Sequence, residues 1–411
     1  MTYIDAVRYL YSLGNEIHTA KLGLERITQL LEYLGNPHRS CRFVHVAGTN
    51  GKGSTSAMIE SGLRASGVRT GLFTSPHLIE PTERIQIAGA PIAPEQFAAA
   101  FEEVHHAAEH MLTAGELDLH PTYFETVTAM AFLLFREQRV DTVVLEVGMG
   151  GRLDATNVVH PDLCVITPIS YDHQAFLGST LAGIASEKFG ILKPGVPAVL
   201  APQMPEVPSP NHSPLVSVAG WPIDGLEVTA RGSRFHSRDL AVCCPLAGGH
   251  QVENALTAAV ALRQLGCGPQ GIAATKWPGR LQRICERPEI ILDGAHNIAG
   301  TQALARYIQQ FYFGRRIWIV YGIMRDKAVR EMTEMLFPLA ERVIATAPDN
   351  SRALPPEQIP GEHVEVVPAV ADALDIVRRE AFPTDVVFIT GSLFLVGQVL
   401  ACAWPVHADK I

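Results

Sequence analysis

The sequence predicts an α/β protein with two domains, each built around a mainly parallel β-sheet. Three observations lead to this prediction. Short apolar runs rich in β-branched residues alternate with longer segments of helical periodicity, a pattern typical of parallel sheets covered on both faces. The alternation is interrupted once, between Pro202 and Pro245, and then resumes. The chain has 411 residues, long enough for two or three domains of ~100–200 residues each.

The strands expected in the first half of the chain are short apolar runs that lie near turn residues. They are FVHVA, RTGLFT, TVVLEVG and LCVITPIS. The helices expected between them are STSAMIESGLRASG and YFETVTAMAFLLFREQ, in which apolar residues recur with helical spacing. This order of strands and helices predicts a parallel sheet with helices on both faces.

A change of composition separates the two halves. Residues 202–245 begin with a proline-rich stretch and continue with GLEVTARGSRFHSRDLAVCC, which is typical of hairpin strands. We therefore expect a small β excursion here, followed by a helix over HQVENALTAAVALRQLG. The Pro-Gly pair in KWPGRLQRI then predicts a hinge near Trp277 to Arg280.

The second half repeats the alternation on a smaller scale. Its expected strands are EIILDGAHN, RIWIVYGIM, RVIATAP and DVVFITGS, with three helices between them. The apolar run from Phe388 to Trp404 contains polar and glycine residues, so we expect a buried strand leading into a buried helix rather than a membrane span. The predicted division is a larger domain of residues 1–278 and a smaller, Rossmann-like α/β domain of residues 279–411.

Composition and charge argue against several classes of protein. Hydrophobic residues make up 47% of the chain and charged residues 18%, so a large core is expected and wholesale disorder is not. The net charge of −9 argues against a nucleic-acid partner and against an anionic membrane surface. The odd count of seven cysteines predicts a reduced, cytoplasmic setting, and the N-terminus lacks the basic and apolar parts of a secretory signal.

The stretch FVHVAGTNGKGSTSAM contains a candidate phosphate-binding loop. An apolar strand precedes the loop and a helix follows it, so the glycine backbone and the helix N-terminus could surround phosphate oxygens. The loop departs from the usual pattern, because Val46 replaces the first glycine and Gly53 replaces the hydroxyl residue. An ordinary glycine turn is the alternative. The candidate nucleotide-binding residues are Gly48, Thr49, Asn50, Gly51, Lys52, Gly53 and Ser54.

A phosphate loop needs a metal partner, and TVVLEVGMGGRLDATN offers one in Glu146. This carboxylate ends an apolar strand, where an unpaired charge is unfavourable. Magnesium prefers oxygen ligands and often binds one or two carboxylates together with substrate phosphates. A salt bridge is the alternative for Glu146, but the glycines and Arg152 that follow favour a functional role.

Eight motifs occur in an order and at spacings that resemble the folylpolyglutamate synthase/dihydrofolate synthase family of Mur-type ligases. They are AGTNGKGS, TSPHL, EVGMGGRLDATN, YDHQAFLG, EKFGILKPG, WPGR, DGAHN and GSLFLVG. The resemblance covers nearly the whole chain. It implies that the larger domain is the P-loop-type, ATP-binding central domain of a Mur ligase and that the smaller domain binds glutamate. Two departures are Met149 in place of a commoner leucine and Ala328 in place of the usual aspartate.

The resemblance also implies two magnesium ions and a set of ligands for them. Ser75 and Glu146 match ligands of one ion, and His173 matches a ligand of the second. Lys188 matches a lysine that is carbamylated in the family, a change that turns its amine into a carboxylate able to hold a metal. Each of these three residues has an alternative, structural explanation if the resemblance is set aside. Ser75 would then be a turn residue, His173 a structural hydrogen-bonding residue, and Lys188 a solvated lysine near a helix end.

Further residues match catalytic and substrate contacts of the family. The expected catalytic residues are Lys52, Lys188 and His296. The residues expected to bind ATP outside the loop are Asn254, Arg280 and Asp293. The residues expected to bind glutamate or the folate are Arg84, Phe124, Arg152, Leu153, Asp154 and Ser392. The alternative for these residues is an ordinary structural role, because surface arginines, capping serines, core histidines and apolar helix stripes are all common in proteins.

The function that the resemblance implies is ATP-dependent addition of L-glutamate to dihydropteroate and to reduced folates through an acyl phosphate. One alternative is the addition of glutamate to folates only. A second is a cell-wall Mur ligase, for which little room for a further domain precedes Gly48. A third is a nucleotide-binding regulator, which would be expected to have lost its metal ligands. The expected partners are small molecules only, and we expect a monomer.

Overall fold

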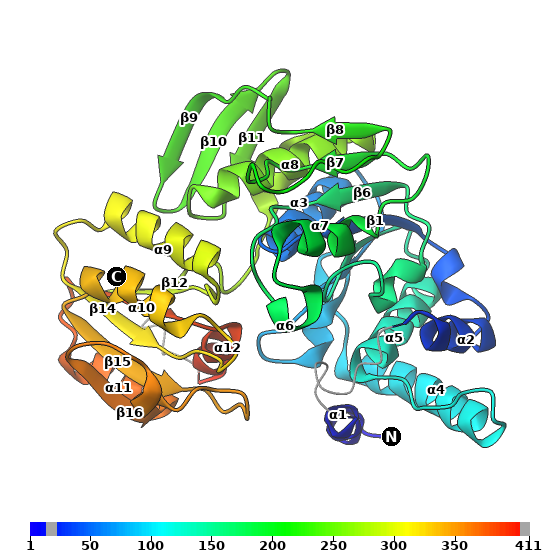
Figure 1. The fold of residues 1–411 in the computed structure, drawn as a ribbon, viewed down its shortest axis with the longest axis horizontal. Helices are drawn as coiled ribbons and strands as arrows, with labels where there is room; N and C mark the ends of the chain where they lie inside the picture. The colour runs from blue at the N-terminus through cyan, green and yellow to red at the C-terminus, as the bar shows by residue number, and fades with distance from the viewer. Residues whose placement is uncertain (14–22, 403–411) are drawn as a thin grey trace. The chain divides into compact units, whose positions relative to one another are not determined.

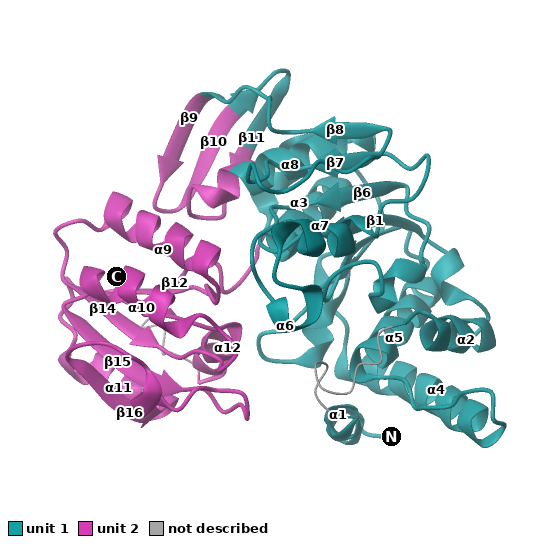
Figure 2. Ribbon diagram, viewed as in Figure 1, with its two compact units in different colours: residues 1–224, 236–242, 253–275 teal, residues 225–235, 243–252, 276–411 magenta. Residues whose placement is uncertain are grey.

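The computed structural model describes residues 1–13 and 23–402 (Figure 1). These described residues form a mixed α/β protein that divides into two compact units (Figure 2). Unit 1 lies within residues 1–224, 236–242 and 253–275, and unit 2 within residues 225–235, 243–252 and 276–411. Each unit has its own mainly parallel sheet, which confirms the predicted fold class. The domain boundary after residue 278 stays a prediction.

Unit 1 is built on an eight-stranded sheet with the order β4-β3-β2-β5-β1-β6-β7-β8. Six of these strands (β2, β5, β1, β6, β7 and β8) are parallel to one another, whereas β3 and β4 form an antiparallel edge. Four of these strands (β1, β2, β5 and β6) are the predicted ones. The eight strands are β1 Arg42–Ala47, β2 Thr70–Phe73, β3 Ile85–Ile87, β4 Ala90–Pro91, β5 Thr142–Glu146, β6 Leu163–Ile166, β7 Ala198–Leu200 and β8 Leu215–Ser217.

Helices cover the sheet of unit 1, and its central strands are buried along their length. All five residues of β5 are buried, as are the last five of β1, which is what near-continuous apolar runs require. The largest apolar cluster joins α4, α5 and the sheet. The helices are α1 Tyr3–Ser12, α2 Glu25–Tyr33, α3 Lys52–Ala65, α4 Pro94–Thr113, α5 Tyr123–Glu137, α6 Gln174–Leu177, α7 Leu181–Phe189 and, for most of its length, α8 His250–Gln264.

The start of α5 is fixed by its own sequence. Thr122 Oγ1 accepts the N–H of Glu125 at 3.2 Å, and the carboxylate of Glu125 accepts the N–H of Thr122 at 2.7 Å. This reciprocal capping satisfies two N–H groups that the first turn of a helix leaves unpaired. Arg26 of α2 donates to the same carboxylate at 2.8 Å, and both side chains are largely buried. The first turn of α5, which carries Phe124, is therefore held firmly in place.

Unit 2 contains a six-stranded sheet with the order β12-β13-β17-β14-β15-β16. All neighbouring pairs are parallel except β12 with β13. The four predicted strands (β13, β14, β15 and β17) are confirmed. The strands are β12 Gln282–Glu286, β13 Glu289–Leu292, β14 Ile317–Tyr321, β15 Arg342–Ala347, β16 Val364–Ala369 and β17 Val386–Thr390. The helices are α9 Ile298–Phe311, α10 Val329–Leu336, α11 Val370–Glu380 and α12 Leu393–Ala401.

The interruption between the two halves forms a separate three-stranded sheet, as predicted, with the order β11-β10-β9. One part of that prediction is wrong, because β8, at residues 215–217, extends the sheet of unit 1 instead. The small sheet consists of β9 Asp224–Thr229, β10 Gly232–Ser237 and β11 Leu240–Cys244. Short 3₁₀ helices span Pro37–Arg39, Pro81–Arg84, Ala155–Val158, Pro269–Ala274, Phe337–Leu339 and Pro356–Gln358.

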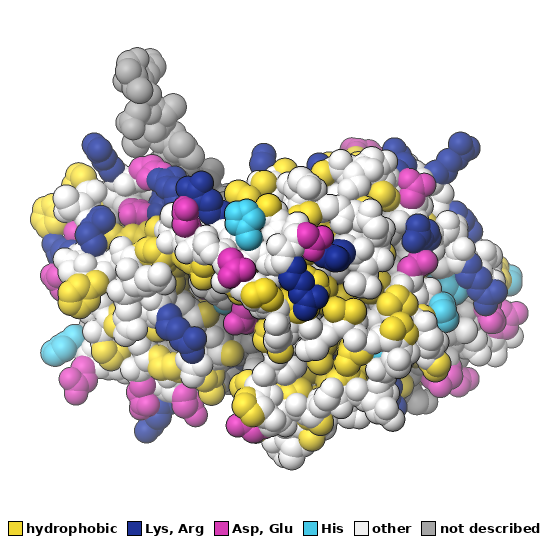
Figure 3. Space-filling view, turned by 90° about the horizontal axis from the view of Figure 1, so that it is seen from above, with side chains coloured by type: hydrophobic (Ala, Val, Ile, Leu, Met, Phe, Trp, Pro, Cys, Tyr) yellow, Lys and Arg dark blue, Asp and Glu magenta, His cyan; other side chains and the backbone are white. Residues whose placement is uncertain are grey.

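The apolar run that begins at Phe388 forms β17 and then α12, as predicted, and its last two residues lie outside the described part of the chain. Across the described residues, every helix is too short or too polar to cross a bilayer. On the face shown in Figure 3, basic and acidic side chains are interspersed.

His45 of β1 is expected to make the fold sensitive to acid. Its side chain is fully buried, with Nε2 2.9 Å from Thr156 Oγ1, and burial lowers the pKa of the imidazole to about 3. The unfolded chain binds a proton near pH 6.5 while the folded chain does not, so acid favours unfolding below that pH. Between pH 7.5 and pH 5, His45 should lower the free energy of unfolding by about 2 kcal/mol.

The measurement is the free energy of unfolding of the wild type and of His45→Gln at both pH values. The variant should lose less stability on acidification, whatever its stability at neutral pH. An exposed histidine gives the control, and His106→Gln should respond to pH as the wild type does. Equal pH dependence in wild type and His45→Gln would show that the buried imidazole is not the titrating group.

Candidate active site

The loop between β1 and α3 has a backbone that only glycine fits at two positions. Gly48 has φ 147° and Gly51 has φ 82°, conformations that side chains with a Cβ rarely adopt. A Cβ on Gly48 would collide with the side chain and backbone of Thr167, and one on Gly51 would collide with the Asn254 amide. The loop is therefore tightly enclosed, and Asn254, an expected ATP ligand, lies directly against it.

Replacing Gly51 with alanine is expected to weaken ATP binding about tenfold or more. The new methyl group would push Asn254 out of place and would strain the left-handed backbone by about 1–2 kcal/mol. A tenfold change in affinity corresponds to about 1.4 kcal/mol, so displacement of one contact is sufficient. Calorimetric titration with a non-hydrolysable ATP analogue measures the affinity, and thermal unfolding measures the strain.

Gly67 offers a matched control at the other end of the same helix. Its φ is 85°, nearly that of Gly51, but a Cβ there would meet no atom within 4 Å. Gly67→Ala should therefore show the backbone strain without the loss of nucleotide affinity. Equal affinities in the two variants would contradict a role for the Gly51–Asn254 contact in binding.

The segment after β6 holds the loop from one side. The N–H groups of Thr49 and Asn50 donate to the carbonyl of Pro168 at 2.9 and 3.2 Å. The side chains of the same two residues bond Ser170, one to its carbonyl at 3.1 Å and the other to its hydroxyl at 2.9 Å. The loop leads directly into the first turn of α3, and the N-terminus of a helix is suited to binding an anion.

Glu146 lies beside the loop at the same edge of the sheet. In the register of β1 with β5, it pairs with Val46, two residues before Gly48. Its carboxylate is 3% exposed and accepts the N–H of Ser75 at 3.2 Å. The structure thus brings together Glu146 and Ser75, the two residues expected to hold one magnesium ion. Their hydroxyl and carboxylate oxygens are the ligands that magnesium prefers.

Lys188 of α7 reaches the other side of the same loop. Its side chain is 4% exposed, and Nζ donates to the carbonyl of Gly48 at 2.9 Å. Burial, reinforced by the charge of Lys52, lowers the pKa of this amine to about 7. The alternative of a solvated lysine near a helix end is therefore wrong. Lys193, five residues on, is half-buried and donates instead to Asn157 Oδ1 at 2.8 Å.

His173 is the N-cap residue immediately before the short helix α6 and has a left-handed backbone, φ 51°. Its N–H is bonded to its neighbour Asp172 at 2.9 Å, and its side chain is partly exposed. It lies three residues after Ser170, which contacts the phosphate loop. Its role as a metal ligand stays a prediction.

The residues expected at the folate lie near the glycine-rich turn that follows β5. The ring of Phe124 lies so close to Gly148 that a Cβ there would collide with it, and the rings of Phe124 and Phe73 are 5.8 Å apart. Arg152 pairs with Glu187 at 2.9 Å on the surface, next to the partly buried Leu153. The ring of Phe124 therefore lies against the glycine-rich turn, whereas the guanidinium of Arg152 is already paired with the carboxylate of Glu187.

Asp154 and Arg84 are both buried among other protein groups. The Asp154 carboxylate accepts the N–H groups of Met149 and Thr156, each at 3.0 Å, and burial raises its pKa. Arg84 donates from Nε to His77 Nδ1 at 2.9 Å, and its guanidinium lies 5.1 Å from the ring centre of Tyr123. Asp154 therefore shapes the turn from within, and its substrate contact stays a prediction.

In unit 2, Asp293, His296 and Ser392 follow two neighbouring parallel strands, β13 and β17, whereas Arg280 precedes β12. Asp293 is buried, accepts the N–H groups of Leu281 and Ala295 at 3.0 and 2.9 Å, and has a pKa that burial raises. A Cβ on Gly294 would lie against the Arg280 guanidinium, so Arg280 runs beside this turn. His296 Nδ1 lies 2.8 Å from the Gly294 carbonyl, and Ser392 caps α12 by accepting the Leu395 N–H.

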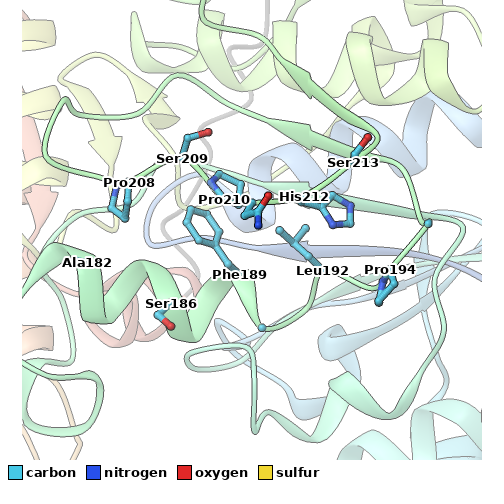
Figure 4. Close-up of a pocket in the computed structure, with 13 residues that line it drawn as sticks. Ala182, Ser186, Phe189, Leu192, Pro194, Pro208, Ser209, Pro210, His212 and Ser213 are labelled. Atoms are coloured by element: carbon cyan, nitrogen blue, oxygen red, sulfur yellow. The ribbon is translucent and has the colours of Figure 1, made fainter.

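One pocket in unit 1 contains none of these residues. It has a volume of about 680 Å³ and lies between α7 and the proline-rich segment 208–213 (Figure 4). Phe189 and His212 line it together with small polar residues, and charged side chains are missing from its lining. It is therefore separate from the residues that surround the phosphate loop.

Comparison with known proteins decides the family. Residues 46–201 match the Mur ligase middle domain, and residues 279–393 match the Mur ligase, glutamate ligase domain. A Bacillus subtilis protein named dihydrofolate synthase/folylpolyglutamate synthase is 36% identical over 97% of this chain and 98% of its own. The chain belongs to the folylpolyglutamate synthase/dihydrofolate synthase family of Mur ligases. It is therefore an ATP-dependent ligase that forms amide bonds.

Solved structures of this family share the fold. A Mycobacterium tuberculosis folylpolyglutamate synthase complexed with ADP and AMPPCP has a TM-score of 0.86 and 31% identity, covering 97% of this chain and 98% of its own. A bifunctional folylpolyglutamate synthase/dihydrofolate synthase from Yersinia pestis complexed with AMPPNP and Mn ion has a TM-score of 0.84 and 30% identity, with 98% of both chains covered.

The contacts of Pro168 and Ser170 with the phosphate loop were not predicted from the sequence. The signal that could have indicated them is that the neighbouring strands β1 and β6 both end at this loop.

Proposed function

We propose that this ligase adds L-glutamate both to dihydropteroate and to reduced folates. The observation that carries the proposal is the convergence on the phosphate loop in unit 1. The buried Lys188 amine bonds the Gly48 carbonyl, and the Glu146 carboxylate lies at the adjacent strand end, bonded by Ser75. Phosphoryl transfer depends mainly on such positioning and charge neutralisation. The names of the Bacillus subtilis and Yersinia pestis relatives support both activities.

The reaction has two steps. A carboxylate oxygen of the acceptor attacks the terminal phosphorus of ATP, and ADP leaves with the electrons of the broken P–O bond. The α-amine of glutamate then attacks the acyl carbon, loses a proton and displaces inorganic phosphate. Lys52, whose Nζ lies 3.3 Å from the Thr49 carbonyl, supplies positive charge at the loop. Asn254, Arg280 and Asp293 are the proposed further contacts to ATP.

The proposed metal ligands are Ser75 and Glu146 for one magnesium ion, and His173 with carbamylated Lys188 for a second. When bound, magnesium neutralises phosphate charge and aligns the reacting oxygens. Carbon dioxide adds only to a neutral amine, and a lysine with a pKa of about 7 is neutral in a large fraction of molecules at physiological pH. The Yersinia pestis complex, which contains manganese, supports a divalent ion.

The proposed substrate contacts divide between the two units. In unit 1, Phe124, Arg152, Leu153 and Asp154 lie near the turn after β5, and Phe124 could stack on a planar pterin ring. Arg84 in unit 1, and His296 and Ser392 in unit 2, are the proposed residues near glutamate. We also propose a monomer that acts in the cytoplasm, where the seven free cysteines would stay reduced.

A substrate panel tests the proposal. The full-length protein receives ATP, magnesium, labelled L-glutamate and either dihydropteroate or tetrahydrofolate, and the products are identified by mass. We expect each acceptor to gain a glutamyl residue, with one ADP released per bond. Turnover with tetrahydrofolate alone would reject the activity on dihydropteroate, and turnover with neither acceptor would reject the proposal. Omitting glutamate controls for ATP hydrolysis that is not coupled to bond formation.

A further inference from the structure

Two histidines and a glutamate meet in unit 1, among residues that the proposed reaction does not use. His105 and Glu109 are one turn apart on α4, so their side chains lie on the same face of the helix. His120 approaches them from the loop that leads into α5. One ligand atom from each of the three residues lies within 4.8 Å of the other two.

The ring nitrogens that face this cluster have no hydrogen-bond partner among the described residues. His105 Nδ1 and His120 Nε2 are both buried atoms, and both lack such a partner. They lie 3.9 and 3.6 Å from Glu109 Oε1, too far for good hydrogen bonds. Ligand atoms about 2.0–2.1 Å from a tetrahedral ion are about 3.4 Å apart, so a small inward movement would bring all three to one ion.

The surrounding groups already orient the cluster for a metal. His120 Nδ1 lies 2.9 Å from the Pro121 carbonyl, so it can donate a proton there and leave the lone pair of Nε2 directed at the cluster. The His105 ring stacks on Phe101, with ring centres 5.5 Å apart and planes 7° apart. Tyr9 donates its hydroxyl to Glu109 Oε1 at 3.4 Å.

We propose that His105, Glu109 and His120 bind a divalent transition-metal ion of the zinc class, with water as the fourth ligand. Two imidazole nitrogens and one carboxylate oxygen suit zinc, whereas magnesium prefers oxygen alone. The ion would tie the loop after α4 to α4 itself, two residues before the Thr122 cap of α5. The site is separate from the ligands proposed for the magnesium ions.

Metal titration of the full-length protein tests the site. The protein is treated with a chelator, returned to buffer with excess magnesium, and titrated with Co²⁺ by visible absorption and with Zn²⁺ by calorimetry. We expect one ion per chain and the absorption of a four- or five-coordinate cobalt centre. His105→Gln, Glu109→Gln and His120→Gln should each weaken binding at least about tenfold, since even the loss of supporting residues outside the ligand set has effects of this size.

Exposed histidines on the same helix provide the controls. His106→Gln and His110→Gln leave the cluster intact and should bind as the wild type does. Zinc should also raise the melting temperature of the wild type and of these controls, a readout that does not depend on the folding of the ligand variants. Wild-type affinity in the three ligand variants, a zinc-independent melting temperature, or the absence of stoichiometric binding would each overturn the site.

Discussion

Replacing Lys188 with methionine is expected to lower the ligase kcat by roughly 10²–10³-fold, the loss typical of removing one group that stabilises charge in a transition state. Methionine keeps the length and apolar contacts of a side chain that is 4% exposed, so the fold should persist. What disappears is the amine that bonds the Gly48 carbonyl and that we propose becomes a carbamate. ADP release at saturating ATP, glutamate and tetrahydrofolate measures the effect.

Lys193→Met is the matched control. This lysine lies five residues further on and is half-buried, and within the described part of the chain its amine bonds Asn157 alone, at 2.8 and 3.4 Å. Its loss should reduce stability by about 1 kcal/mol and leave kcat within about twofold of the wild type. If both variants lose turnover equally, the effect of Lys188→Met reflects structural damage rather than lost chemistry. If Lys188→Met retains full turnover, the proposed carbamate is wrong.

Depletion of carbon dioxide distinguishes a carbamate at Lys188 from an ordinary positively charged amine. With a pKa of about 7, the neutral fraction of the Lys188 amine rises from about 10% at pH 6 to about 90% at pH 8. Wild-type enzyme depleted of carbon dioxide should therefore lose turnover and regain it with bicarbonate, more readily at the higher pH. Lys188→Met should not respond to bicarbonate at either pH.

The parts of the fold that could be predicted are the ones with a strong local pattern. Strands buried on both faces, such as β1 and β5, must be apolar at nearly every position, and this run is visible in the sequence. The edge strands β4 and β16 keep many exposed residues, and no such run marks them. Helix α4 was not predicted either, because alanines and histidines dilute its buried face of Phe97, Phe101 and Val104.

The residues of the candidate site also differ in whether a local sequence pattern marks them. The loop and Glu146 could be located from local motifs, because the loop follows one apolar strand, Glu146 ends another, and parallel strands end at one edge. The contact of Lys188 with Gly48 joins residues 140 positions apart, and a lysine in a helix gives no local sign of burial. The carboxylate of Asp154 accepts backbone N–H groups of its own turn, a local contact that the motif does not indicate. Its contact with substrate stays a prediction.

Replacing Glu146 with glutamine is expected to separate activity from stability. The amide oxygen can still accept the Ser75 N–H that the carboxylate accepts at 3.2 Å, so local geometry should survive. The negative charge is lost, and we expect kcat/KM to fall by roughly 10²–10³-fold. The magnesium concentration needed for half-maximal rate should rise about tenfold or more. Steady-state rates across a magnesium series measure both quantities.

The stability of Glu146→Gln, in contrast to its activity, should stay the same or increase. Glu146 is 3% exposed, and removal from water disfavours a charged carboxylate more than a neutral amide. Without ATP and magnesium the variant should therefore melt at the same temperature as the wild type or higher. Glu137→Gln, at the exposed end of α5, should change neither property. A Glu146→Gln enzyme with wild-type magnesium dependence would mean that this carboxylate holds no metal, and the phosphate loop would then lack the partner on which the proposed chemistry depends.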